Sequence, residues 1–273
     1  MIRKPQQSSP ENLWNRLARD LIYDSKQVLL YAGIEIPNRM DKGRPVDYSH
    51  IVERITKGTG AGAIYDPTTR RIHFEPDYIQ KIIDFQSRFD FPVLDKAFGP
   101  GGIAGYIQED NGNGDYRLKN PSANDIIRQA MMASSRQIPF AFVSARQLAQ
   151  YEVEQFGIMT NIYNGPIFLY VSSREGVAEA EKLHGGEGRY LITTHSIFDS
   201  PLTLSYKERV DVFFQCVEKG VPVYLTTMPF SGQNGPMTPY GIALLSFAEF
   251  LAGMAMAYAV NPKTIIVDGA YPT

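Results

Sequence analysis

The chain has 273 residues, of which 44% are hydrophobic and 21% charged, proportions typical of a globular protein. Its 27 basic and 29 acidic side chains leave a formal net charge of -2, so no basic field is available for a phosphate backbone and nucleic acid is excluded as an expected partner. The single cysteine, Cys216, excludes an intramolecular disulfide and a thiolate metal cluster, and an N-terminus without an apolar segment predicts a cytoplasmic protein.

Residues 1–138 read as an N-terminal helical and β-hairpin region. Apolar residues with helical spacing follow a Ser-Pro-Glu start signal and predict a first helix, and two turn-rich stretches between β-type runs predict two hairpins. The predicted elements, in chain order, are a helix over 11–33, a hairpin over 63–74, a helix over 75–89 and a hairpin whose turn is at 111–114.

Residues 139–273 change to an alternation of short apolar runs and helical stretches, which is the signature of βαβ units around a parallel sheet. The fold class predicted is α/β, a TIM-type (β/α)8 barrel that is incomplete, because about three further units are needed for closure. We expect either a missing continuation of the chain, or a second polypeptide or another copy of the chain, to complete it along the last strand. The predicted strands are 140–143, 166–171, 189–195, 222–227 and 264–268, and the predicted helices are 146–156, 174–183, 204–219 and 239–260.

The most apolar stretch, residues 240–260, is long enough to be read as a membrane span. It carries Glu249, is rich in small residues and is not flanked by Lys/Arg clusters. We therefore expect a buried core helix and no membrane association.

The chemistry of such a sheet collects at the carboxyl ends of its strands, which marks His195 and Asp268 as candidate catalytic residues. His195 could serve as an acid, a base or an orienting donor, or its ring could simply be satisfied by neighbouring hydroxyls. Asp268 could bind a cation, position a proton or cap a loop. No HExxH, CxxC or GxSxG motif is present and the four histidines are scattered, so no bound metal is expected.

A long Gly/Pro-punctuated loop, residues 226–236, follows the predicted strand 222–227, and loops of this length at such a place are usually functional. Aromatic rings near the strand ends could hold a quaternary ammonium ion through cation–π attraction, although most aromatic residues in any chain belong to the core. The candidate substrate-binding residues are Phe98, Tyr106, Phe230, Gln233 and Tyr240.

The segment from Pro222 to Gly269 resembles the trimethylamine:corrinoid methyltransferase family. The likeness is carried by Met228-Pro229, Gly232, Pro236-Met237-Thr238, Ala248-Glu249-Phe250-Leu251-Ala252-Gly253 and Val260-Asn261-Pro262, and more loosely by Phe98-Gly99-Pro100-Gly101-Gly102. The resemblance implies a barrel enzyme that moves a methyl group from a methylated amine, either trimethylamine or a betaine, to the Co(I) corrinoid (cobalamin) of a partner protein. The cofactor would belong to that cognate corrinoid protein.

The resemblance leaves the substrate branch open. The trimethylamine enzymes of the family carry a pyrrolysine beyond the strand corresponding to 264–268, whereas relatives without it act on quaternary amines, and this sequence ends before that position. Two alternatives stand beside the leading one: a non-catalytic truncated or split half with a binding or assembly role, and another barrel enzyme that uses His195 and Asp268 as a proton-transfer pair.

Overall fold

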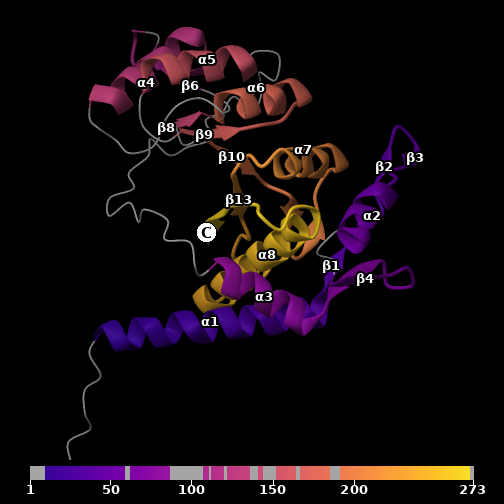
Figure 1. Ribbon diagram of the computed structural model, residues 1–273. Coiled ribbons are helices and arrows are strands. Elements are labelled where there is room, and N and C mark those ends of the chain that lie inside the picture. Colours follow the sequence, from indigo (N-terminus) through magenta and orange to yellow (C-terminus); the bar gives the residue numbers. More distant parts are fainter. Residues whose placement is uncertain are drawn as a thin grey trace, which may run out of the picture.

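The computed structural model describes residues 10–58, 62–86, 107–110, 112–119, 122–135, 141–143, 152–163, 167–184 and 191–270 (Figure 1). The helices are α1 (Pro10–Ala32), α2 (Ser49–Lys57), α3 (Pro76–Gln86), α4 (Ala123–Ser135), α5 (Glu152–Ile162), α6 (Arg174–His184), α7 (Lys207–Glu218) and α8 (Pro239–Val260). The strands are β1 (Ile34–Glu35), β2 (Met40–Asp41), β3 (Arg44–Pro45), β4 (Ala63–Asp66), β5 (Arg71–Phe74), β6 (Ile107–Asp110), β7 (Tyr116–Lys119), β8 (Ala141–Val143), β9 (Ile167–Tyr170), β10 (Leu191–His195), β11 (Phe198–Asp199), β12 (Thr203–Leu204), β13 (Val223–Thr227) and β14 (Ile266–Ala270).

One of the two five-stranded sheets is parallel, and its strands stand side by side in the order in which they occur in the chain, β8–β9–β10–β13–β14. All five strands predicted as apolar runs are present in it. The strands in its middle are buried because helices from the intervening segments pack against them.

Two of these helices cover the same face of the sheet. The ring of His195 on β10 meets Phe213 of α7 with ring centroids 5.6 Å apart. Leu225 on β13 lies beneath α8, where a Cβ built on Gly253 would come within 2.5 Å of Leu225 Cδ1. Because His195 and Leu225 are in register, α7 and α8 lie on one side of the strands.

The second sheet joins the two halves of the sequence. Its order is β11–β12–β1–β5–β4, so strands from the N-terminal region pair with a short hairpin, β11–β12, inserted between β10 and α7. Helix α1 also runs along α8 (Figure 1), where Ser25 Oγ donates to the carbonyl of Leu244 at 3.2 Å. The division at 138/139 stays a sequence-based prediction, and the described parts on either side of it share one core.

The observed helices differ from the predicted ones at three places. The helix expected over 204–219 begins at Lys207, because Leu204 pairs in β12 and the N–H of Ser205 donates to Ile197 O at 2.8 Å. Helix α5 continues to Ile162, beyond the expected end at 156, with Gly157 inside it. Helices α2 and α4 were not among the predicted elements.

Helix α8 is long and apolar enough to cross a membrane by length and composition, the one such helix among the described residues. Of its most apolar window, 78% is buried inside the structure. Buried core helices meet the same criteria, so this is weak support for a membrane span. Its ends are set by Thr238, whose Oγ1 accepts the N–H of Gly241 at 3.1 Å, and by Asn261.

Candidate functional site

His195 ends β10, but its side chain turns into the helix-covered face of the sheet. It is 3% exposed, and Nε2 lies 2.9 Å from Thr193 Oγ1. The Thr193 hydroxyl itself donates to Pro222 O at 3.1 Å, so it accepts from a proton on Nε2 and fixes that tautomer. Burial lowers the pKa of His195 to about 3, which keeps the ring neutral. This environment agrees with the alternative interpretation of His195, in which neighbouring hydroxyls satisfy the hydrogen bonds of the ring.

Asp268 lies within β14, and its backbone pairs with Leu225, the residue that also pairs with His195. One strand therefore separates the two candidate catalytic residues, a backbone separation of roughly 10 Å. The backbone places them in one register row, and the side chain of Asp268 lies outside the described part of the chain. The proton-transfer pair stays a prediction.

The loop between β13 and α8 is folded on itself through its backbone. The N–H of Phe230 donates to Asn234 Oδ1 at 2.6 Å, and Phe230 O accepts the N–H groups of Gln233, Asn234 and Gly235 at 3.2, 3.3 and 3.1 Å. Gly232 has φ +72°, a left-handed conformation that glycine adopts without steric cost. The Phe230 ring is left 41% exposed, so it is free to meet a ligand.

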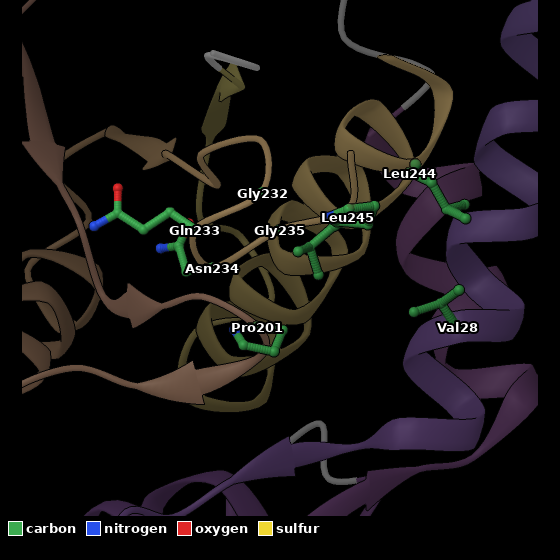
Figure 2. A pocket seen from close by; sticks show the side chains of 10 residues that line it. Val28, Pro201, Gly232, Gln233, Asn234, Gly235, Leu244 and Leu245 are labelled. Carbon is green, nitrogen blue, oxygen red and sulfur yellow. The ribbon is translucent and has the colours of Figure 1, made fainter. Parts of the chain in front are cut away.

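A cavity of about 510 Å³ lies under this loop. Its walls come from α1, from the turn between β11 and β12, from the loop and from the first turns of α8, and Figure 2 shows Gln233 and Leu244 on opposite sides of it. None of the residues that line it carries a charge. The lining residues are Val28, Pro201, Gly232, Gln233, Asn234, Gly235, Pro236, Gly241, Leu244 and Leu245.

One wall of the cavity is held by a buried carboxylate. Glu249 on α8 is 0% exposed; its Oε2 accepts from Ser200 Oγ and its Oε1 from the N–H of Leu202, both at 3.0 Å. These two donors flank Pro201, which lines the cavity. Burial raises the pKa of Glu249 to about 7, with a smaller contribution from Asp199.

A second buried carboxylate holds another strand end. Glu152, at the start of α5, accepts the N–H of Ser172 at 2.6 Å and the hydroxyl of Ser173, so it fixes the connection from β9 to α6. Burial raises the pKa of Glu152 too. Neither it nor the two serines line the cavity.

The remaining candidates are not gathered at the cavity. Tyr240 is 47% exposed, and its hydroxyl donates to Asp24 Oδ2 of α1 at 2.5 Å, so it ties α8 to α1. Phe98 and Tyr106 lie outside the described residues. Gln233 is therefore the one predicted substrate-binding residue found in the cavity lining, with Phe230 on the same loop.

Sequence reasoning missed Pro201 and Glu249 as parts of the site. A lone carboxylate inside an apolar helix is a signal that could have drawn notice to Glu249, but its partners lie 47 and 49 residues away. Thr227, at the end of β13, is 2% exposed and its hydroxyl has no hydrogen-bond partner among the described residues. Within the described part of the chain, no three His, Cys, Asp or Glu side chains come together as a metal site would require.

Comparison with known proteins gives one partial similarity to report. The chain is 32% identical over 76 residues to glycine betaine methyltransferase of Desulfitobacterium hafniense, and this stretch covers 28% of the chain. It spans only 16% of that relative's length. No protein-family model matches the chain. The similarity indicates a relationship to a methyltransferase of the betaine type.

Proposed function

We propose that this protein takes part in moving a methyl group from a quaternary amine of the betaine type to the Co(I) corrinoid of a partner protein. The observation that carries the proposal is the partial similarity to glycine betaine methyltransferase. The motifs around the loop between β13 and α8 support it, because the cavity lies directly under that loop.

We further propose that the parallel sheet is part of a (β/α)8 barrel. Its strand order follows the chain without reversal, and α7 and α8 lie on one face of it. Doubly wound sheets reverse their strand order and place helices on both faces, whereas barrels wind in a single direction.

The cavity suits a small methylated amine better than a corrinoid. At about 510 Å³ it is smaller than a corrinoid macrocycle with its side chains, which supports the assignment of that group to the partner protein. Its lining combines aliphatic side chains with the amides of Gln233 and Asn234. Aliphatic carbon can contact the methyl groups, and the amide oxygen of Gln233 can turn toward the positive charge, whereas that of Asn234 accepts the N–H of Phe230.

The chemistry fits a quaternary substrate. The Co(I) of the partner would supply the electron pair for the new bond to carbon, and the C–N bond would break with its electron pair on nitrogen. A betaine nitrogen would then leave as a neutral tertiary amine without any proton transfer, whereas trimethylamine would react as trimethylammonium, the form that predominates near neutral pH, and leave as dimethylamine. None of the residues lining the cavity is an acid, and His195 is buried and neutral. The work of this chain would be to orient one N–CH₃ bond and exclude water.

Methyl transfer to free cob(I)alamin, followed by absorbance, tests the proposal. We expect conversion with glycine betaine and less with trimethylamine, with proline betaine and carnitine as further substrates. Gln233→Ala should reduce the rate, while Gln80→Ala, at an exposed glutamine on α3 bonded to Lys26 and Asp84, should not. No conversion of any of the four amines, with the partner corrinoid protein also supplied, would overturn the proposal and favour a non-catalytic half.

A further inference from the structure

We infer that Glu249 is a positioning residue that fixes Pro201 in the wall of the cavity. Its carboxylate accepts one hydrogen bond from the residue before Pro201 and one from the residue after it, each at 3.0 Å. The effect on substrate rests on the proposed function; the effect on the wall does not.

The backbone next to Pro201 needs such a restraint. Leu202 has φ +47°, a left-handed conformation that is unusual for a branched residue with a β-carbon. Its N–H donates to Glu249 Oε1, and its carbonyl accepts the N–H of Glu35 on β1 at 2.8 Å. Because both polar groups of this peptide segment are taken, α8 and β1 together hold the strained residue in place.

The same helix supplies the facing wall. Leu245 lies one turn before Glu249 on α8 and lines the cavity together with Leu244. Glu249 therefore sets the distance between the Pro201 wall and the leucine wall. The base of the hairpin has its own anchor, since Asp199 pairs with Arg39 and accepts from Ser205 Oγ at 3.1 Å. Loss of Glu249 should thus free the tip of the hairpin and leave its base attached.

Three variants separate positioning from general stability. Glu249→Ala removes both acceptors. Glu249→Gln keeps an amide oxygen that accepts the N–H of Leu202 and adds an amide N–H that can donate to Ser200 Oγ. Glu152→Ala is the matched control, because Glu152 is also a buried carboxylate that holds two donors of a loop, at a place that does not line the cavity. Should Glu249→Ala show no cooperative unfolding, Ser200→Ala removes one of the two bonds from the hairpin side.

Hydrogen–deuterium exchange of residues 198–205 and calorimetric binding of glycine betaine are the two measurements. In Glu249→Ala we expect exchange at Leu202 and the dissociation constant for glycine betaine each to rise about tenfold, which corresponds to the loss of one hydrogen bond. Glu249→Gln should restore most of both, and Glu152→Ala should change neither.

The two measurements fail independently. Unchanged exchange at 198–205 in Glu249→Ala would overturn the inference whatever the protein binds. Faster exchange with unchanged betaine affinity would show that the wall does not position the substrate. If the wild type binds no methylated amine, the proposed function fails, and the exchange data still decide whether Glu249 holds Pro201.

Discussion

The pH dependence of stability is expected to reveal His195 as a buried neutral side chain. The ring has its pKa lowered from 6.5 to about 3, so below pH 6.5 the unfolded chain binds a proton that the folded protein refuses. The contribution of His195 is therefore fully present above pH 6.5 and is lost as the pH falls toward 3. One proton corresponds to about 1.4 kcal/mol per pH unit, so acidification from pH 6.5 to 5.0 should remove roughly 2 kcal/mol.

Glu249 acts in the opposite direction over nearly the same range. Its pKa is raised from 4.5 to about 7, so the folded protein keeps a proton that the unfolded chain releases. This contribution is present below pH 4.5 and is lost as the pH rises to 7; between pH 7 and 5 it adds roughly 2 kcal/mol on acidification. The wild type should consequently show a shallow profile in which two steep terms offset each other.

Urea unfolding from pH 7.5 to 5.0 of the wild type, His195→Gln, Glu249→Gln and the double variant separates the two terms. Glutamine can place its amide nitrogen near the position of the imidazole Nε2, opposite Thr193. His195→Gln should gain stability on acidification, Glu249→Gln should lose it, and the double variant should be nearly flat. If the profile of His195→Gln follows that of the wild type within about 0.5 kcal/mol, the reasoning on His195 is refuted.

Three further predictions concern the loop, the helix that follows it and two buried hydroxyls. Thr227→Val should raise the free energy of unfolding by about 1 kcal/mol, because it replaces a buried hydroxyl that has no partner among the described residues. Ser246→Ala, at a second such hydroxyl, should have the same effect. If urea unfolding shows a lower stability for both variants, these hydroxyls are hydrogen-bonded. Gly232→Ala and its control Gly220→Ala, with φ +72° and +71°, should each lose about 1 kcal/mol of stability, but only Gly232→Ala should weaken glycine betaine binding measured by calorimetry. Tyr240→Phe removes an exposed hydrogen bond to α1 and should change the urea unfolding midpoint little while leaving betaine affinity unchanged. A clear loss of affinity would return Tyr240 to the substrate site.

The parallel sheet could be predicted because its strands are buried on the helix-covered face and read as continuous apolar runs. Helix α8 was predicted at both ends, since Thr238-Pro239 and Asn261-Pro262 are strong start and stop signals. The second sheet could not be predicted. Its strands β1 and β12 are two residues long and carry no periodicity, and they pair across more than 160 residues of sequence.

The candidate site was predicted in part for the same reason. A loop rich in Gly and Pro after a buried strand can be recognised in the sequence, so Gln233 and Phe230 could be predicted as candidate residues. The direction of a side chain at a strand end could not: His195 occupies the expected position, but the alternation along β10 turns it toward Phe213. Pro201 and Glu249 become neighbours only when the hairpin folds against α8, a contact that local sequence does not encode.

Transfer of a labelled methyl group tests the central claim most directly. Glycine betaine carrying deuterated N-methyl groups would be incubated with the protein, its corrinoid partner and reduced cobalamin, and the products analysed by mass spectrometry. We predict a deuterated methyl group on cobalt and an equal amount of deuterated dimethylglycine, with Gln233→Ala slower than Gln80→Ala. Unlabelled cobalamin and intact betaine after incubation of a folded protein with its partner would contradict the account.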